Sequence, residues 1–428
     1  MVRVHSVGHD PARCIGCVDC LRACPSQAIR VRAGAPIVKD ECCIDCGACV
    51  DACRHGAMQP RTATSADLAR YRKTVAMPHL TLYAQFGPEV TPGQILAGLR
   101  AIGFDSAVDL SFMCELVAGA TDAYLSECDG PWPKISVTCP AVLRLIQIRY
   151  PELLAHLVPI ETPRELAAKL QRRRLAAELA ISPEEIGIFF ISPCTAIANS
   201  IVSPVGQAPS HFDGALSMAD IHGPLLKAIK ALPPLAEPAI SARGLKWAMS
   251  GGEVSAMRNQ SSLTVRGTAD MTHVFDRIEA GEFAEVDYIE AYICPDGCVS
   301  GQLAVTGRYA ARHTLQRLAR RLGEHEGVKE EKVRALLAEH FFDMKGEIAA
   351  RPIRPLGESL RHLIAVRRER TAVLNLLPGK NCGACGAPDC AALVDDILAG
   401  EATLQDCVFV KIETLKRHLE SERGGTSE

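Results

Sequence analysis

Three features that would point to a membrane, a nucleic acid or secretion are missing from this sequence. Among its 428 residues no apolar run approaches the length of a membrane-spanning segment. The formal net charge is only −3, which gives no sign of a nucleic acid or an anionic membrane as a partner. The opening residues, Met1 to Ser6, lack the apolar stretch of a secretory signal. We therefore expect a cytoplasmic protein without a membrane span.

Cysteine, by contrast, is abundant, with 19 residues that are mostly clustered. Two runs near the N-terminus share the order C-x2-C-x2-C-x3-C. The runs are Cys14, Cys17, Cys20 and Cys24, then Cys43, Cys46, Cys49 and Cys53. This is the ligand spacing of bacterial ferredoxins that hold two [4Fe–4S] clusters, whereas zinc sites rarely show it. Such clusters need a reducing compartment, which again indicates the cytoplasm.

In ferredoxins of this type the fourth cysteine of each run serves the other cluster. The expected ligand sets are therefore Cys14, Cys17, Cys20 and Cys53 for one cluster, and Cys43, Cys46, Cys49 and Cys24 for the other. We assign residues 1–60 to this ferredoxin-like α+β module. The polar, basic residues 61–78 are interpreted as a linker or connecting helix.

From Leu80 onward, strand-like and helix-like segments alternate, which is typical of a layered α/β domain with parallel sheets. The predicted domain covers residues 79–350. Its predicted strands are 80–86, 106–110, 134–138, 186–192 and 287–293. Helices are predicted at 95–102, after Thr91 and Pro92, and at 140–150, and the charged stretch 310–350 is expected to be helical.

A small module follows a basic connector helix predicted at 351–372. It carries the order C-x2-C-x4-C-x16-C in residues 373–415, before a tail at 416–428. The cysteines are Cys382, Cys385, Cys390 and Cys407. We expect them to hold a further [4Fe–4S] cluster in a small helical module.

Four more cysteines stand alone at the ends of predicted strands. They are Cys139, Cys194, Cys294 and Cys298. The carboxyl ends of parallel strands are where α/β sheets bind ligands. A single cysteine is usually a small core residue, but four at such positions indicate a fourth metal centre.

The order T-C-P-A, P-C-T-A and E-x-x-x-C-x-x-G-C-x-x-G resembles the three signature loops of the [FeFe]-hydrogenase catalytic domain. The segments 82–105 and 297–321 are similar to that family too, the second to its divergent, sensory-type members. The resemblance covers roughly residues 1–322. It implies an α/β fold of two lobes, each with a small parallel sheet, and a buried cluster between them.

The resemblance also implies site residues. The four isolated cysteines would bind a [4Fe–4S] subcluster, with Cys298 bridging to a two-iron subsite that carries CO, cyanide and an azadithiolate. Glu290 matches the family's glutamate in the third loop. Thr138 stands where the family has a proton-relaying cysteine, so Thr138, Cys298 and Glu290 are the catalytic candidates. A hydroxyl gives up its proton far less readily than a thiol.

Other departures lie in the second and third loops. Ser192 replaces a methionine, and Ile197 replaces a lysine that donates a charged hydrogen bond to cyanide in the family. Tyr292 replaces another methionine. Remaining candidates carry less weight. Cys42, Cys114 and Cys128 are read as ordinary cysteines, Glu115 and Glu127 as acids of a proton path, and Gly251-Gly252-Glu253 as a turn into a helix.

Three functions are consistent with these residues. The first is an active hydrogenase, in which electrons pass along the clusters and protons are interconverted with H2. The second, which the substitutions favour, is a low-activity or hydrogen- and redox-sensing hydrogenase that reports to a redox partner, either a ferredoxin or a signalling protein. The third is an electron-transfer protein that keeps the [4Fe–4S] clusters and lacks the diiron subsite.

Overall fold

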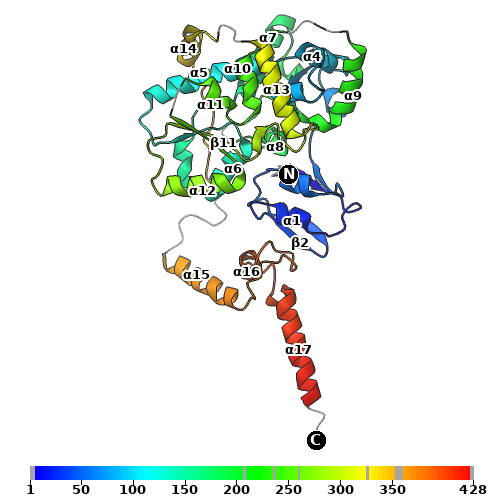
Figure 1. Ribbon diagram of the computed structural model, residues 1–428, viewed down its shortest axis with the longest axis vertical. Coiled ribbons are helices and arrows are strands. Elements are labelled where there is room, and N and C mark those ends of the chain that lie inside the picture. Colours follow the sequence, from blue (N-terminus) through cyan, green and yellow to red (C-terminus); the bar gives the residue numbers. More distant parts are fainter. Residues whose placement is uncertain are drawn as a thin grey trace. The chain divides into compact units, whose positions relative to one another are not determined.

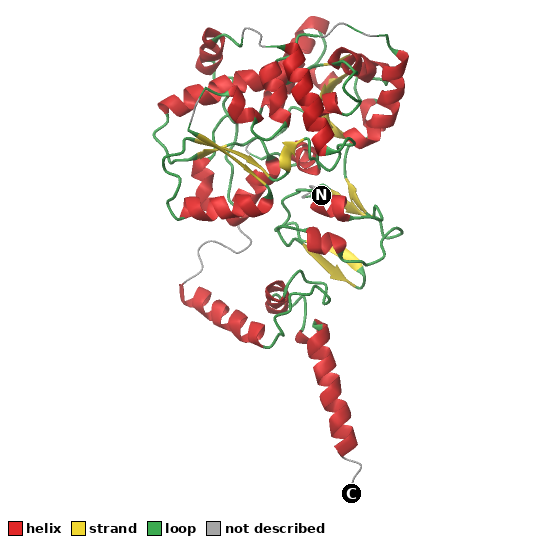
Figure 2. Cartoon of the chain, viewed as in Figure 1, coloured by secondary structure: helices red, strands yellow, loops and turns green. Residues whose placement is uncertain are grey.

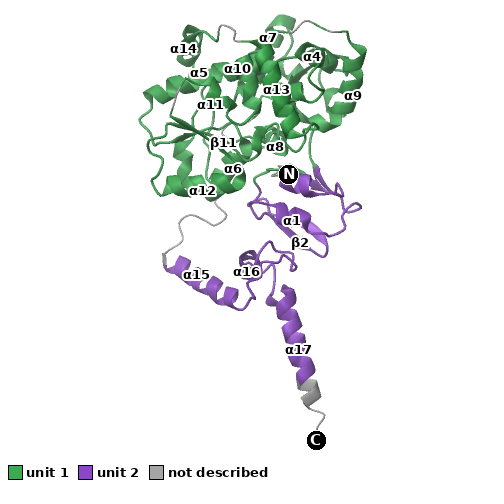
Figure 3. Ribbon diagram, viewed as in Figure 1, with its two compact units in different colours: residues 1–7, 44–47, 60–351 green, residues 8–43, 48–59, 352–428 purple. Residues whose placement is uncertain are grey.

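The computed structural model describes residues 5–205, 209–233, 235, 238–258, 261–323, 327–351 and 360–424 (Figure 1). The chain divides into two compact units (Figure 3). Unit 1 comprises residues 1–7, 44–47 and 60–351, and unit 2 comprises residues 8–43, 48–59 and 352–428. The short segment 44–47 of the second cysteine run therefore belongs to the larger unit.

The first lobe of unit 1 is built on a parallel sheet of four strands in the order β6-β5-β8-β9. These strands are β5 (Lys73–Pro78), β6 (Ser106–Ala107), β8 (Ile186–Ser192) and β9 (Gly214–Ser217). The helices that contact them are α4 (Pro92–Ala101), α7 (Pro163–Leu179), α8 (Thr195–Val202) and α9 (Met218–Ala231). Every residue of β8 is buried, as expected of a parallel strand covered on both faces.

Two sequence predictions are wrong here. Part of the predicted linker 61–78 is β5, which lies between β6 and β8 and is buried from Thr74 onward. The predicted strand 80–86 is a buried 3-10 helix, η1 (Leu80–Ala84), which begins where the His79 ring accepts a hydrogen bond from the Thr81 amide. A short apolar run can form either a buried strand or a buried helix. Here the hydrogen bond between the Thr81 amide and the His79 ring favours the helix.

The second lobe contains a parallel sheet of three strands in the order β10-β11-β7. These strands are β7 (Lys134–Ile135), β10 (Ser262–Arg266) and β11 (Tyr288–Tyr292). The surrounding helices are α5 (Ser111–Glu127), α6 (Pro140–Arg149), α11 (Gly252–Ala256) and α12 (Thr268–Glu279). In Figure 1, α6 and α12 lie on one side of β11, and α5 and α11 lie on the other. The predicted α/β fold of two lobes with small parallel sheets is confirmed.

Further elements complete unit 1, and Figure 2 shows how short its strands are beside its helices. They are α3 (Ser65–Leu68), η2 (Pro151–His156), η3 (Pro183–Glu185), α10 (Ala242–Leu245), η4 (Lys246–Ala248), β12 (Pro295–Cys298), α13 (Arg308–Leu322) and α14 (Glu330–Ala338). Within the stretch predicted to be helical at 310–350, the described helices are α13 and α14, and the second ends at Ala338. None of the helices described is long and apolar enough to cross a membrane.

Unit 2 holds the ferredoxin-like elements and the C-terminal helices. The ferredoxin elements are α1 (Asp19–Ala23), α2 (Ala48–Ala52) and the antiparallel pair β2 (Ile29–Arg32) and β3 (Ala35–Val38), with β1 (Val7–His9) and β4 (Met58–Pro60) at the boundary with unit 1. The C-terminal elements are α15 (Leu360–Asn375), α16 (Cys390–Leu398), η5 (Leu404–Asp406) and α17 (Val408–Gly424). Residues 352–359 of the predicted connector lie outside the described residues, and α17 continues through the predicted start of the tail at 416.

Candidate metal centres

The four isolated cysteines lie at strand ends that come from both lobes. Cys139 follows β7 and caps the N-terminus of α6. Cys194 follows β8 and caps α8 in the other lobe. Cys294 comes two residues after β11, and Cys298 ends β12. Parallel strands deliver their carboxyl ends to one edge of a sheet, and the two lobes present these edges to the same site.

The thiols of these cysteines lie close enough to influence one another electrostatically. Burial raises the pKa of the Cys298 thiol well above its ordinary value, and negative charge on the other three cysteines raises it further. Burial likewise raises the pKa of Cys194 to about 12. Four sulfurs gathered at one site cannot ionise together without a compensating cation, and the iron of a [4Fe–4S] cluster would supply one.

Backbone amides point at these sulfurs. Although burial raises the pKa of Cys139, hydrogen bonds from the amides of Ile293, Val142 and Ala141 lower it. Amides of Ile197 and Ala196 do the same for Cys194. Amide donors at the start of a helix favour an anionic sulfur, and hydrogen bonds to sulfur are an established determinant of cluster potential. The donors present therefore fit a thiolate-ligated cluster.

Within the part of the chain that the structure describes, no group of three His, Cys, Asp or Glu side chains is arranged to hold a single metal ion. A single zinc ion needs donors about 2.0–2.3 Å from one point. The thiolates of a cubane, in contrast, bind separate iron atoms and stand further apart.

Arg164, on α7, is a functional candidate that the sequence did not reveal. Its guanidinium donates hydrogen bonds to the Thr138 carbonyl at 3.3 Å and to Ser200 Oγ at 3.4 Å. Its positive charge lowers the pKa of Cys139, Cys194 and Cys298 against the larger effect of burial. A cation therefore faces three of the four predicted ligands. No sequence signal marks it, since it lies 25 residues from the nearest of them.

The loop positions that depart from the family have defined roles in packing. Ser192 Oγ donates to the Cys194 carbonyl at 2.7 Å and accepts from the Cys194 amide at 3.3 Å, so it shapes that turn. Ile197 is buried in the core of the first lobe. Tyr292 is fully buried, and its hydroxyl donates to the Trp247 carbonyl at 3.3 Å.

Glu290 is completely buried and binds backbone groups. Its two carboxylate oxygens accept hydrogen bonds from the amides of Gly251 and Val254 at 2.7 and 2.9 Å. Burial and the charge of Glu253 raise its pKa to about 8. In this geometry Glu290 positions the turn into α11. Its catalytic role stays a prediction. Gly251, in the left-handed conformation, and α11 form the turn into a helix that the sequence indicated.

Glu253 is a second buried carboxylate that sequence reasoning missed, because it was seen only as part of that turn. It accepts hydrogen bonds from Ser136 Oγ at 2.7 Å and from the Tyr288 hydroxyl. Burial raises its pKa, whereas the hydroxyls of Tyr288, Ser136, Thr138 and Tyr292 lower it. The Thr138 side chain is thus linked to a buried acid that retains a proton more readily than an exposed one.

Asp45, in the segment 44–47 that belongs to unit 1, is surrounded by buried partners of the same unit. The Asp45 carboxylate is fully buried, 2.8 Å from the guanidinium of the equally buried Arg144. It accepts further hydrogen bonds from the Ser6 amide at 2.9 Å and from Asn199 Nδ2 at 2.6 Å. Its backbone carbonyl accepts from Thr195 Oγ1, next to Cys194, at 2.7 Å. The loop that carries Cys46 is therefore fixed against the loop that carries Cys194.

Gln302 bridges two predicted cluster ligands. Its side-chain amide donates to the backbone carbonyl of Cys46 and lies 3.8 Å from the sulfur of Cys294. One side chain thus separates a ligand of the second ferredoxin cluster from a ligand of the central cluster.

In unit 2, Cys14, Cys17, Cys20 and Cys53 line one small cavity. This set is the one predicted for the first ferredoxin cluster, including the exchanged fourth ligand. Burial raises the pKa of Cys20 to about 11, and charge on Cys17, Cys53 and Cys14 raises it as well. Near the C-terminus, Cys382, Cys385, Cys390 and Cys407 line a second small cavity. Each arrangement suits one cubane.

The remaining candidates have ordinary surroundings. Cys114 is buried in the first core, and burial raises its pKa well above the usual value. Burial also raises the pKa of Cys42, to about 11. Cys128 is half-buried and contacts the Tyr124 hydroxyl. Burial acts to raise the pKa of the Cys128 thiol, but hydrogen bonds outweigh it and lower the pKa. Glu115 accepts from Ser241 Oγ at 2.5 Å, whereas Glu127 is exposed at the end of α5.

Comparison with known families supports this description. The family described as "Iron only hydrogenase large subunit, C-terminal domain" matches residues 72–222. A "4Fe-4S dicluster domain" matches residues 6–54, and a "Putative Fe-S cluster" domain matches residues 377–409. The two flanking matches contain all twelve cysteines predicted to serve the outer clusters. The hydrogenase match includes Cys139 and Cys194.

Among curated proteins, the chain is 28% identical to the periplasmic [Fe] hydrogenase large subunit of Nitratidesulfovibrio vulgaris over 45% of its own length and 51% of that protein's. It is 29% identical to iron hydrogenase 1 of Clostridium pasteurianum over 26% and 20% of the two lengths. It is 22% identical to the NADP-reducing hydrogenase subunit HndD of Solidesulfovibrio fructosivorans over 45% and 38%. The chain thus matches about half the length of these relatives, or less.

Among solved structures, a variant of the [FeFe]-hydrogenase HydA1 from Chlamydomonas reinhardtii superimposes with a TM-score of 0.52 at 15% identity, over 67% of this chain and 98% of that one. An apo form of the same enzyme gives a TM-score of 0.53 at 14% identity, over 67% and 99%. At such identities the likeness shows the fold. Together with the sequence matches, it supports the description of this chain as a divergent [FeFe]-hydrogenase-like iron–sulfur protein.

Proposed function

We propose that the protein is a low-activity or hydrogen- and redox-sensing member of the [FeFe]-hydrogenase family, in which electrons pass through [4Fe–4S] clusters to a central metal site. The observation that carries this proposal is the bridge of Gln302 between the Cys46 backbone and the Cys294 sulfur. A short, rigid bridge between two ligand loops suits electron exchange between their clusters. The buried ion pair of Asp45 and Arg144 holds the bridge in place.

The chain's own residues support slow chemistry at that site. Thr138, in the position of the family's relay thiol, offers a hydroxyl that does not ionise near neutral pH. Ile197 has no charge with which to replace the family's lysine. The cation near the predicted ligands is instead Arg164, which lies on a different element, α7. When bound, a diiron subsite would supply the metal at which H2 and protons are interconverted. Cys298 would link it to the cluster, and Thr138 and Glu253 would hold or pass a proton.

A second candidate is an electron-transfer protein that keeps the clusters without the diiron subsite. It is favoured by Tyr292, whose fully buried ring occupies a position where the family has a flexible methionine. Under either proposal the chain works in the cytoplasm and exchanges electrons with a separate redox partner, a ferredoxin or a signalling protein.

Infrared spectroscopy and iron analysis of the anaerobically purified protein test these proposals together. A full set of four cubanes and a diiron site brings about 18 iron atoms, and four cubanes alone bring about 16. Bands of CO and cyanide on iron support the hydrogenase proposal, and about 16 iron atoms without such bands support the electron-transfer protein. About 12 iron atoms would exclude a central cluster.

The variant Cys194→Ser provides the matching control, because a serine oxygen is a poor ligand for cluster iron. It is expected to lose the iron of the central site alone. An unchanged iron content would contradict the assignment of Cys194 as a ligand.

A further inference from the structure

A cavity of about 980 Å³ opens among α10, α11 and α13 in unit 1 and contains none of the predicted cluster ligands. Its volume lies at the upper end of the range found for small-molecule sites. The floor and walls come from short segments at 241–258 and from α13, together with Glu115. The predicted metal centres and the proposed electron route leave this cavity without a role.

The side chains around the cavity are predominantly cationic. Five basic residues line it: Arg243, Lys246, Arg258, Arg312 and Arg320. Among the described residues of the lining, Glu115 is the one carboxylate, and its oxygens accept hydrogen bonds from Ser241 Oγ and from the Val328 amide. Cations gathered around a concave site focus a positive potential into it.

Three of the five cations form no ion pair within the described part of the chain. These are Lys246, Arg243 and Arg320, of which Lys246 is half-buried. Arg258 and Arg312 each face one carboxylate, Glu330 at 3.1 Å and Asp296 at 3.5 Å. A half-buried ammonium group without a counter-charge is unfavourable, so an anion in the cavity would stabilise it.

The chemistry of the lining selects the kind of anion. Four guanidinium groups present planar forks that bind phosphate oxygens in pairs. The described part of the lining includes Met249 and Met257 but no aromatic ring on which a base could stack. The cavity would therefore recognise a ligand through the ligand's charged groups. We propose that this cavity binds a small anion carrying several phosphates, either a free polyphosphate or the phosphate chain of a nucleotide.

The same cavity reaches the loop that carries two of the central cysteines. Arg312 pairs with Asp296, which lies between Cys294 and Cys298. Ser250, in the lining, donates its amide to the Asp296 carbonyl at 3.0 Å. A bound polyphosphate competes with Asp296 for Arg312 and adds negative charge near this loop. Binding is thus expected to lower the reduction potential of the central cluster.

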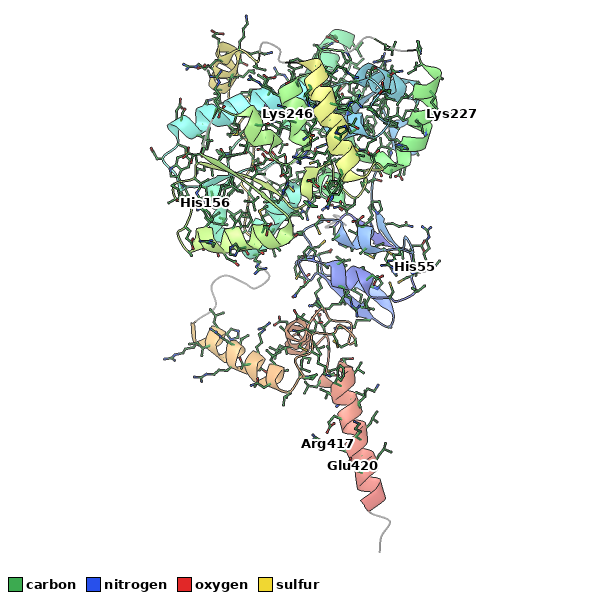
Figure 4. All side chains as sticks on the ribbon, viewed as in Figure 1. His55, His156, Lys227, Lys246, Arg417 and Glu420 are labelled. Carbon is green, nitrogen blue, oxygen red and sulfur yellow. The ribbon has the colours of Figure 1, made fainter. Side chains whose placement is uncertain are left out.

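Figure 4 supplies a matched control for this proposal, because it shows Lys246 beside α10 and α11 and Lys227 on the distant α9. Tripolyphosphate, ATP and citrate are titrated into the full-length holoprotein by calorimetry in buffer near physiological salt. The expected result is one site per chain for tripolyphosphate and for ATP, with citrate at least tenfold weaker. The variant Lys246→Ala with Arg320→Ala is expected to weaken both ligands at least tenfold. The variant Lys227→Ala with Arg317→Ala, which removes the same charge outside the cavity, is expected to bind normally.

The outcomes separate the two ligand sources and test the link to the cluster. Equal binding of tripolyphosphate and ATP assigns recognition to the phosphates, and much tighter binding of ATP assigns the site to nucleotides. No saturable binding, equal binding of citrate, or equal losses in both double variants would overturn the site. A redox titration followed by electron paramagnetic resonance is expected to show a lower central-cluster potential with ligand, and a smaller shift in Arg312→Gln. An unchanged potential would overturn the link. Calorimetry does not require a diiron subsite, so failure of the proposed function leaves this test intact.

Discussion

The Asp396 carboxylate lies 2.6 Å from Nε of Arg30 and is fully buried. Arg32 and Lys39 approach the same carboxylate at 2.7 and 2.9 Å, so three cations from the ferredoxin-like elements surround one acid on α16. Burial alone would raise the pKa of Asp396, but hydrogen bonds from Arg30 and Lys39 outweigh it and lower the pKa. The C-terminal cluster module and the ferredoxin-like strand β2 are thereby joined.

Asp396→Asn is expected to separate these two parts of unit 2. Removing one partner of a buried ion pair leaves uncompensated charge and costs about 3–5 kcal/mol. Faster proteolysis between 360 and 424 and a lower thermal midpoint, at an unchanged iron content, are the expected readouts. The neighbouring Asp395 pairs with Arg370 on the half-exposed surface, where such pairs contribute about 0–1 kcal/mol. Equal effects of Asp395→Asn and Asp396→Asn would contradict this prediction.

The sequence predicted features that depend on a short segment of the chain better than features that depend on contacts between distant residues. The sequence grouped Cys14, Cys17, Cys20 and Cys53, and likewise the four C-terminal cysteines, and each of these two groups lines one cavity, while their roles as cluster ligands stay predictions. The strand β8 was predicted with its observed bounds, since an apolar run of seven residues between turns allows few alternatives. The bounds of β8 depend on residues that are close together in the chain.

Contacts between distant residues could not be predicted in this way. Arg164, Glu253 and the pair Asp45–Arg144 become functional candidates only because folding brings separate elements together. The strand β5 was taken for a linker, since basic residues precede its short apolar run and its partner strands β6 and β8 come from later parts of the chain. A single sequence contains no local signal for such placements.

Arg164→Gln is expected to lower the reduction potential of the central cluster. The guanidinium favours the anionic state of three predicted ligands, so its loss makes the addition of an electron less favourable. Potentiometric titration monitored by electron paramagnetic resonance measures the shift. Arg173→Gln, an exposed change on the same helix, serves as the control. A potential that moves equally in both variants, or in neither, would be evidence against a specific role.

The buried pair Glu253 and Glu290 is expected to make the protein less stable as the pH rises. Burial raises the pKa of both groups, and that of Glu290 reaches about 8. An unfolded carboxyl group ionises near about 4.3. Between these values the unfolded chain has released a proton that the folded pair retains, so rising pH favours unfolding by about 1.4 kcal/mol per pH unit for each such proton. Below this window the effect disappears, and above it the loss levels off.

Glu253→Gln tests this dependence. The Ser136 and Tyr288 hydroxyls can reorient toward an amide, so the variant is expected to fold and to lose less stability than the parent between pH 6 and pH 8. Anaerobic denaturant titrations at several pH values give the comparison. Glu339→Gln, at an exposed position, controls for the change in net charge. Parallel pH profiles for the parent and Glu253→Gln would show that the pair is not the origin.

Thr138→Cys is the most direct test of slow proton supply. The change places a thiol beside Cys139, in place of the hydroxyl that interacts with Glu253. A thiol ionises near neutral pH, whereas a hydroxyl does not, and a well-placed proton relay accelerates a reaction by roughly 100-fold or more. Hydrogen evolution from a reduced dye is therefore expected to rise if CO and cyanide bands are present. Thr138→Ser, which keeps the hydroxyl, is the control.

Ile197→Lys extends this test to the missing cation. Since Ile197 is buried in an apolar core, the lysine carries a desolvation cost unless an anionic ligand of the diiron subsite faces it. With such a ligand, the double variant Thr138→Cys and Ile197→Lys is expected to exceed either single variant in hydrogen evolution. Without one, it is expected to be less stable than Thr138→Cys and no more active. Iron-bound CO and cyanide bands with no gain in any variant would show that proton supply is not limiting. Absence of the bands from every variant would instead favour the electron-transfer protein, because no chemistry at a diiron subsite would then remain to be accelerated.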